Sequence, residues 1–305
     1  MPNTATLQTT SAIPWRVYLE LCKPKVVLLI AFTAVVGMLL STPSIVPFSL
    51  LFFATVGISL AAAGGAAVNH WVDQNIDDMM ERTKNRPLPQ HKISSFKVIG
   101  FALSLTLLSM IILVAFVNTL TAILTFISAV GYAVIYTMYL KKTTPHNIVL
   151  GGAAGAAPPV LGWVAVTGEL HINALLLFLI IFIWTPPHFW ALAIKRRKEY
   201  AKADVPMLPV THGVAFTKAN IVLYTMMLLA VTLLPFLTNM SGELYLIGAV
   251  SLGIGFLYHV ITLYRSEGDE HAMKTFAYSI FYLSALFGFL LLDHYAREFI
   301  RAFVL

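Results

Sequence analysis

Residues 61–78 read AAAGGAAVNHWVDQNIDD, so a run of small apolar residues passes directly into a polar segment. Asn69, Asp73 and Asp77 follow one another at intervals of four, and a helix therefore places all three side chains on one stripe. Small residues let helices pack closely in a membrane, and ionisable groups inside a membrane bundle are usually functional. The stretch predicts a membrane helix whose polar stripe faces other helices.

The composition of the whole chain agrees with this prediction. Of 305 residues, 58% are hydrophobic and 11% charged, whereas soluble domains are roughly 45–50% apolar and about 25% charged. A span needs about 20 mostly apolar residues. We therefore expect an all-α, polytopic integral membrane bundle, residues 1–305 forming one domain. Nine segments qualify as spans: 26–41, 48–69, 98–117, 120–138, 147–167, 174–194, 219–238, 244–264 and 275–292.

The positive charges of the chain alternate from loop to loop. Of its 20 Lys and Arg residues, 18 fall in the N-terminal segment and in every second loop, and the intervening loops have none. The positive-inside rule places the N-terminus and the long loops 70–97 and 195–218 in the cytoplasm. Arg297 and Arg301 fall outside this pattern, so we expect the C-terminal tail to lie as an interfacial helix.

The first residues, 1–14, are polar and are expected to be a disordered tail. They lack both the apolar core of a signal peptide and the arginines of a mitochondrial transit peptide. A bacterial inner membrane is therefore the expected location. The net charge of +6 belongs to short loops between apolar segments, so no nucleic-acid partner is expected.

The polar stripe suggests a metal-diphosphate site. Asp73 and Asp77 repel each other unless a cation lies between them, and carboxylate oxygens suit Mg²⁺ that is shared with substrate phosphates. Arg82 and Arg86 follow closely, and guanidinium groups match phosphate oxygens. The alternative is a solvated, acid-rich helix end before a basic loop. The small residues before the stripe favour the first interpretation.

Three further segments hold candidate residues. Tyr139 and Lys142 lie in the loop around 136–147, although paired lysines at a helix end are often only topology signals. Pro186 and Pro187 predict a break in the sixth span, such as often lines a cavity, with His188 beside it. A lone histidine in apolar surroundings is more often a hydrogen-bonded core residue. A second charged cluster follows on the same predicted side: Lys195, Lys198, Glu199 and Tyr200.

The motifs resemble a known family. Asn69-x₃-Asp73-x₃-Asp77 with the following Arg82-Thr83-x₂-Arg86-Pro87-Leu88 is similar to the first aspartate-rich motif of the UbiA-type intramembrane prenyltransferases, which include quinone-precursor enzymes. The segments 184–194 and 205–210 resemble the haem O synthase (protohaem IX farnesyltransferase) branch. One departure is Glu199, where that branch usually has aspartate, so the carboxylate of a second metal site is either Glu199 or the nearby Asp204.

The resemblance implies transfer of a farnesyl group from farnesyl diphosphate to a vinyl group of haem B, with addition of water, to give haem O. It implies that Asp73 and Asp77 hold Mg²⁺, with Glu199 in a second ligand position and Asn69 as a neutral helper. His188 would contact haem, and Tyr139 would stabilise an allylic cation through its ring face. The remaining implied substrate contacts are Lys25, Arg82, Arg86, Lys142, Lys195, Lys198 and Tyr200.

Two other functions remain open from the sequence. One is an aromatic or quinone-precursor prenyltransferase with the same metal site. The other is a secondary transporter, since broken helices and buried charges occur there too, although the carboxylates gather at one face and no inverted repeat is evident. The haem branch would also imply haem A synthase or terminal oxidase assembly proteins as partners.

Overall fold

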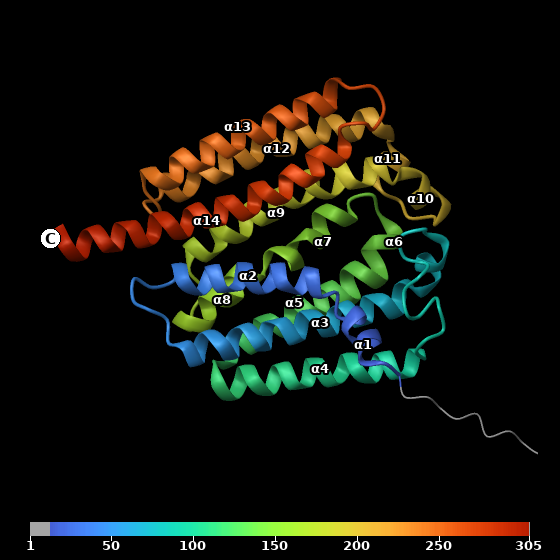
Figure 1. Ribbon diagram of the computed structural model, residues 1–305, viewed down its shortest axis with the longest axis horizontal. Coiled ribbons are helices and arrows are strands. Elements are labelled where there is room, and N and C mark those ends of the chain that lie inside the picture. Colours follow the sequence, from blue (N-terminus) through green and yellow to red (C-terminus); the bar gives the residue numbers. More distant parts are fainter. Residues whose placement is uncertain (1–12, 305) are drawn as a thin grey trace, which may run out of the picture.

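The computed structural model describes residues 13–304, with side chains to residue 300, and every regular element in this part of the chain is a helix (Figure 1). The expected disordered tail falls almost wholly outside the described residues. The helices are α1 (Trp15–Leu21), α2 (Pro24–Leu40), α3 (Phe48–Met79), α4 (Ser95–Phe116), α5 (Thr119–Val130), η1 (Gly131–Leu140), α6 (Lys141–Thr143), α7 (Asn147–Ala156), α8 (Pro158–Thr167), α9 (Ile172–Lys195), α10 (Arg197–Lys202), α11 (Leu208–Thr211), α12 (Gly213–Leu237), α13 (Glu243–Arg265) and α14 (Ala272–Val304).

The predicted membrane bundle is confirmed. Within the described residues, eight helical segments are long and apolar enough to cross a membrane, or nine if the bent pair of α1 and α2 is counted as one further span. Large apolar side chains such as Leu107, Ile111 and Val114 of α4 are exposed on the outside of the bundle. Exposure of such apolar side chains to water is unfavourable, whereas lipid accommodates them. The helix can lie in lipid because it satisfies its own backbone hydrogen bonds.

Helix α3 is longer than the predicted span. It continues to Met79, ten residues beyond the expected end at 69, so Asn69, Asp73 and Asp77 lie on one unbroken helix. The first span also begins earlier than predicted, because α1 precedes α2 at an angle of 54°. Lys23 joins the two helices with a left-handed backbone conformation, φ 50°.

The predicted break in the sixth span is wrong. Helix α9 runs continuously through Pro186 and Pro187. The break occurs instead in the fifth span, where Pro158 and Pro159 begin α8 directly after α7. Proline is well tolerated in the first turn of a helix, because the N–H that it lacks would have no partner there. The C-terminal tail is no separate interfacial helix either: α14 runs on to Val304 and projects beyond the bundle (Figure 1).

Glycines bring α2 and α8 into direct backbone contact. A Cβ atom at Gly162 would lie 1.9 Å from the carbonyl oxygen of Ala34, and one at Gly37 would lie 2.1 Å from that of Pro159. Neither neighbour is a side chain that could move away. Close approach of this kind is typical of small residues between membrane helices.

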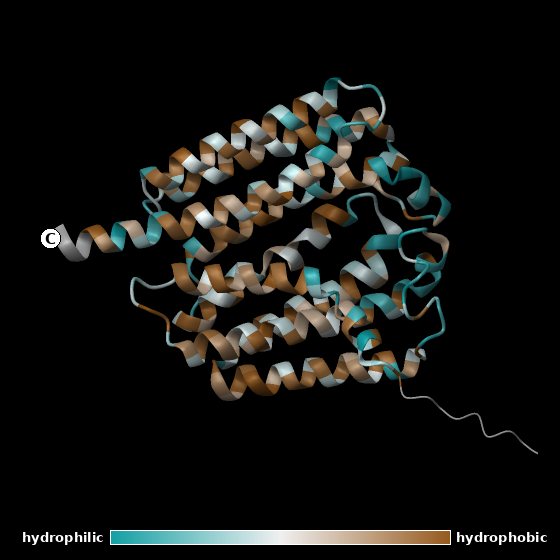
Figure 2. Ribbon diagram, in the orientation of Figure 1, coloured by the Kyte–Doolittle hydropathy of each residue, from teal (hydrophilic) through white to brown (hydrophobic). Residues whose placement is uncertain are grey.

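The loops with most polar residues gather at one end of the bundle. Figure 2 shows hydrophilic residues concentrated where α6, α10, α11 and the segment after α3 meet, with hydrophobic residues along the helices. The α3 stripe reaches this end from inside the bundle. The candidate site therefore lies where the apolar interior meets the polar loops.

Substitution of Gly162 by Ala should destabilise the bundle, because α2 and α8 must separate to accommodate the new methyl group. Overpacking of this kind costs about 1–3 kcal/mol. Gly155→Ala is the matched control, since a Cβ at Gly155 has no neighbour within 4 Å. The thermal unfolding temperature in detergent should fall for the first variant and not for the second; equal temperatures would contradict the close contact.

Candidate active site

The polar stripe of α3 is fully buried. Asn69, Asp73 and Asp77 have exposed fractions of 4%, 1% and 3%. Isolated buried carboxylates are very costly, so groups of this kind are paired with cations or bind metals. The prediction that the stripe faces the interior of the bundle is confirmed. The solvated helix end, which was the alternative, does not fit these exposed fractions.

Three cations from three different elements reach the stripe. Lys141, at the end of the fourth span, places its Nζ 2.5 Å from Oδ2 of Asp73. Arg86, in the segment after α3, donates from Nη1 to both carboxylate oxygens of Asp77, at 2.8 and 2.7 Å. Lys23, between α1 and α2, donates to Oδ1 of Asn69. The two buried negative charges are thereby neutralised within the chain.

Asn69 connects these groups. Its amide nitrogen donates to Oδ2 of Asp73 at 2.8 Å and to the hydroxyl of Thr137 at 3.3 Å. Thr137 is itself fully buried and donates to the carbonyl of Tyr132 at 2.9 Å. Both amide atoms of Asn69 are therefore used, which fixes the orientation of its side chain. The spacing of the stripe predicts Asn69, whereas no pattern in the sequence indicates Thr137.

The segment that supplies Thr137 and Lys141 is a π-helix. Residues Gly131–Leu140 of η1 continue α5 with wider turns, and such segments occur often at functional sites. Thr137 and Lys141 lie one turn apart, and both face α3. Lys142, which we had predicted instead, is exposed. The structure therefore brings Lys141, not Lys142, to the carboxylates.

Two tyrosines from η1 lie behind the site. The rings of Tyr132 and Tyr136 stack with centroids 5.7 Å apart, and Asp73 is close enough to act electrostatically on both. Glycines make room for them: a Cβ at Gly151 would lie 2.1 Å from the ring of Tyr136. Tyr139, the predicted aromatic contact, is exposed. The aromatic wall of the site consists of the other two rings.

The donor set fits a divalent cation that is shared with a ligand. Oδ1 of Asp73 is buried and has no hydrogen-bond partner in the part of the chain that the structure describes, so one carboxylate oxygen remains to accept a cation. Among the described residues, no three His, Cys, Asp or Glu side chains are grouped to hold a metal ion. Mg²⁺ usually takes only one or two carboxylates and completes its shell with water and substrate phosphates. Asp73 and Asp77 are the two carboxylates that such an ion would need.

A second cluster surrounds Tyr200 on α10. Tyr200 is buried, and this burial raises the pKa of its phenol above the usual value, while the guanidinium groups of Arg82 and Arg196 partly oppose the shift. Its hydroxyl thus stays protonated at neutral pH and can donate a hydrogen bond. Glu199 accepts from Arg196 at 2.9 Å through Oε1, and its Oε2 is buried without a partner. Glu199 and Asp73 both act electrostatically on Tyr200, so the two clusters adjoin.

Other predicted residues lie at the edge of this end of the bundle. Lys195 is exposed and lies 3.5 Å from Asp269, in the loop before α14. Lys25, Arg82 and Lys198 are also exposed. None of them makes a hydrogen bond to the α3 stripe in the described part of the chain. They are not part of the α3 stripe, although Arg82 acts electrostatically on the buried Tyr200.

His188 packs between α9 and α14. Its Nδ1 lies 2.7 Å from the hydroxyl of Ser279, and its ring stacks on Trp184 and Phe276 with centroids 4.2 and 4.5 Å apart. Trp184 also donates to the backbone of Ser279, at 2.8 Å. These contacts join two helices. The structure does not bring His188 into contact with the α3 stripe.

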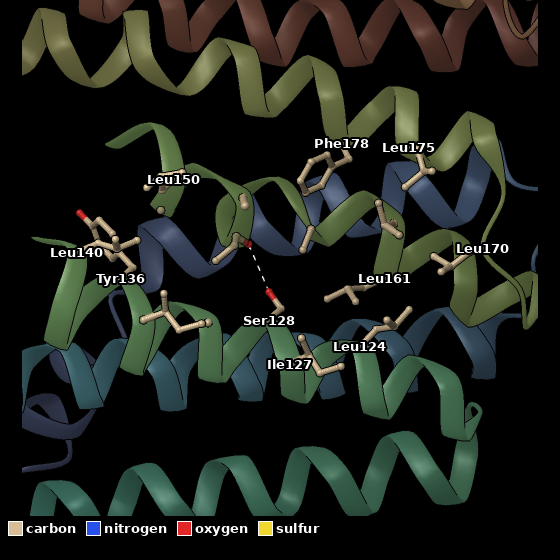
Figure 3. A pocket seen from close by; sticks show the side chains of 17 residues that line it. Leu124, Ile127, Ser128, Tyr136, Leu140, Leu150, Leu161, Leu170, Leu175 and Phe178 are labelled. Carbon is tan, nitrogen blue, oxygen red and sulfur yellow. Dashed lines mark hydrogen bonds between the residues drawn. The ribbon is translucent and has the colours of Figure 1, made fainter. Parts of the chain in front are cut away.

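An apolar pocket of about 390 Å³ opens beside the site (Figure 3). Its walls come from α5, η1, α7, α8 and the start of α9. Figure 3 shows Tyr136, Leu140 and Leu150 at one end, and Leu170 and Leu175 at the other. Asp73 acts electrostatically on Tyr136, so the end of the pocket that Tyr136 lines is the end nearer the carboxylates.

The chain is similar to proteins of a known family. The family model for the UbiA prenyltransferase family matches residues 30–286. The chain belongs to this family. It is 60% identical to the protoheme IX farnesyltransferase of Nitrosococcus oceani, over 98% of this chain and 100% of that protein. The protein of the same name from Methylococcus capsulatus is 56% identical, over 97% of this chain and 99% of the relative.

Solved structures of UbiA-type proteins share the fold. A digeranylgeranylglyceryl phosphate synthase superposes with a TM-score of 0.78 at 20% identity and covers 92% of this chain and 99% of its own. A UbiA homolog from Archaeoglobus fulgidus, solved with GPP and Mg²⁺, gives 0.62 at 15% identity, over 90% and 99%. At these identities the likeness concerns the fold. A multi-pass membrane prenyltransferase is the class to which this chain belongs.

Replacing Lys141 by Ala should lower kcat/KM for prenyl transfer by roughly 100-fold, because loss of one partner leaves a buried charge uncompensated and removes a cation from the leaving group. Lys142→Ala is the matched control and should remain within about twofold, since exposed charges contribute little. Product formation from a prenyl diphosphate is the measurement. A larger loss of activity for Lys142→Ala than for Lys141→Ala would assign the contact with the substrate to Lys142, the residue that the sequence favoured.

Proposed function

We propose that this chain is a haem O synthase: it transfers the farnesyl group of farnesyl diphosphate to a vinyl group of haem B, with addition of water, and releases diphosphate. The observation that carries the proposal is the buried carboxylate pair, held by Lys141 and Arg86 beside an apolar pocket. High identity to protoheme IX farnesyltransferases over nearly the full length supports haem as the acceptor.

Binding of the diphosphate should rearrange the charges of the site. Asp73 and Asp77 would hold Mg²⁺, with Glu199 as a further carboxylate near Tyr200. When bound, the ion neutralises the phosphate oxygens and favours departure of diphosphate. Lys141 and Arg86 are then free to turn from the carboxylates to the phosphate oxygens. Their charges stabilise the leaving group where negative charge develops.

The farnesyl chain belongs in the apolar pocket, whose volume of about 390 Å³ is within the range of small-molecule sites. Cleavage of the C1–O bond gives an allylic cation at the end of the pocket where Tyr136 lies. We expect the ring of Tyr136, which lines this end of the pocket, to stabilise it. The buried position also keeps water from the cation before the acceptor reacts.

In the last step, the vinyl group of haem reacts with the farnesyl cation. The terminal vinyl carbon of haem attacks C1 of the farnesyl cation, and a carbon–carbon bond forms. Positive charge then lies on the vinyl carbon next to the porphyrin ring. Water adds there and loses a proton, which gives the hydroxyethylfarnesyl group. Farnesyl diphosphate, haem B and water thus become haem O and diphosphate, with no oxidant or reductant required.

The exposed cations have supporting roles in this proposal. Lys25, Arg82, Lys195 and Lys198 are exposed around the site and would attract the anionic substrates electrostatically. His188 and Tyr139 keep their sequence-based roles in haem and cation binding only as predictions. Tyr200 would donate its hydroxyl to a phosphate oxygen.

The cellular setting belongs to the same proposal. Residues 1–305 form one prenyltransferase domain in a bacterial inner membrane, with the N-terminus and the site loops in the cytoplasm, as the 18 positive charges at that side favour. Proteins that use or modify haem O, such as haem A synthase or terminal oxidase assembly factors, would be its partners.

The central experiment expresses the parent chain or Asp73→Asn in a host that lacks its own haem O synthase, and analyses extracted haem by mass spectrometry. We expect farnesylated, hydrated haem from the parent. Production by the variant should fall by roughly 100-fold or more, because one carboxylate no longer neutralises the cation of the site.

Two controls make the result decisive. Asp78→Asn alters an exposed carboxylate next to the stripe and should leave production unchanged. Assay of the purified parent with a phenolic acid acceptor tests the quinone-precursor alternative. Unmodified haem together with a prenylated phenol would show that the chain is a quinone-precursor prenyltransferase and not a haem O synthase.

A further inference from the structure

His70 is a buried side chain whose ring nitrogens have no hydrogen-bond partner among the described residues. Its exposed fraction is 2%, and both Nδ1 and Nε2 are without such a partner in residues 13–300. Other interior histidines are satisfied: His188 bonds to Ser279, and His294 to the carbonyl of Thr42. A buried polar group without a partner loses its hydrogen bonds to water and forms none in the protein. This typically costs about 1–3 kcal/mol of folding free energy. His70 therefore has the features of a residue that binds something.

A cavity lies against His70. Its volume is about 640 Å³, within the 300–1,000 Å³ typical of cofactor-sized sites. It is bounded by α1, the start of α2 and the inner face of α3. Lys23 and Arg86 line it, and the same two side chains hold Asn69 and Asp77 of the carboxylate site. The cavity and the carboxylate site thus share a wall.

The lining has three kinds of group. Arg16 and Lys25 supply positive charge near the mouth, Trp15 and Val26 supply apolar surface, and His70 supplies two ring nitrogens at the buried end. Glu20 also lines the cavity, but its one carboxylate is outnumbered by the four cations Arg16, Lys23, Lys25 and Arg86. A matching ligand is large and partly apolar, has carboxylates at one edge, and presents a Lewis acid to an imidazole. A porphyrin that holds iron has all of these features.

Competing ligands fit less well. Lys23 and Arg86 would repel a free divalent cation beside His70. Ferrous iron within the porphyrin dianion forms a neutral unit, so the same cations do not oppose it. A diphosphate would suit the cations but would leave the apolar surface and the imidazole without a partner. The chemistry of the cavity thus favours the haem substrate.

We infer that this cavity between α1 and α3 is the haem subsite, with His70 as the axial ligand of the iron and with Arg16 and Lys25 as partners of the propionates. The inference rests on the proposed function. It deepens that proposal because His70 is adjacent to Asn69 and one turn before Asp73 on α3. An iron held there places the edge of the porphyrin beside the carboxylate site, where the farnesyl cation forms.

The test is spectroscopic and does not depend on turnover. The purified full-length chain is titrated with haem B, and the Soret and visible bands report an imidazole on iron. For His70→Ala we expect loss of the imidazole-type spectrum and a Kd for haem that rises about tenfold or more. Added free imidazole should restore the spectrum, because it can occupy the vacated space. Affinity for farnesyl diphosphate with Mg²⁺ should stay within about twofold.

Three further variants locate the ligand. His70→Gln preserves size and polarity, so it separates ligation from folding and should also lose the spectrum. His188→Ala tests the residue favoured by the sequence. His259→Ala, on α13, is the matched control and should resemble the parent. An unchanged spectrum in His70→Gln, or loss of the spectrum only in His188→Ala, overturns the inference.

The measurements distinguish a failure of the His70 inference from a failure of the proposed function. Haem O made in cells by a parent chain whose haem spectrum lacks an imidazole signature would refute the role of His70 alone. A parent that neither binds haem nor makes haem O, while it prenylates another acceptor, would refute both. Arg16→Ala and Lys25→Ala should each weaken haem binding without loss of the imidazole-type spectrum, since they act on the propionates.

Discussion

The structure depends on the burial of two carboxylates, one helical turn apart, in a bundle that is surrounded by lipid. Asp73 and Asp77 are tolerated there because Lys141 and Arg86 approach them at 2.5 and 2.7 Å. Removal of one partner from a buried ion pair typically costs about 3–5 kcal/mol, so the three elements that carry these groups are tied together. The same pairs are available for exchange when a diphosphate brings its own negative charge.

Several features of the fold are needed to bring these charges together. Helix α3 must extend to Met79 so that the stripe and the loop with Arg86 meet. The wide turns of η1 place Thr137 and Lys141 towards α3, with Tyr132 and Tyr136 beside them. Close packing at glycines allows the helices to approach. The polar site and the apolar pocket therefore lie next to each other, as a substrate with a charged head and a hydrocarbon chain requires.

The sequence predicted much of this architecture. Apolar run lengths and alternating loop charges gave the spans, and intervals of four residues gave Asn69, Asp73 and Asp77, because both patterns are local. It could not predict which of two adjacent lysines faces α3, since a π-helix changes the register without a composition signal. It also placed a break at Pro186 and Pro187, where packing against neighbouring helices maintains α9. Contacts across the bundle, such as Lys23 with Asn69, have no sequence pattern at all.

The most direct test of this account measures metal binding with and without the diphosphate. Mn²⁺ replaces Mg²⁺, and electron paramagnetic resonance reports free and bound metal in the purified parent chain, alone and with an unreactive thio analogue of farnesyl diphosphate. If Lys141 and Arg86 occupy the carboxylates until the diphosphate attracts them, the affinity for Mn²⁺ should be weak alone and rise about tenfold or more with the analogue. Equally tight metal binding in both cases would contradict the account.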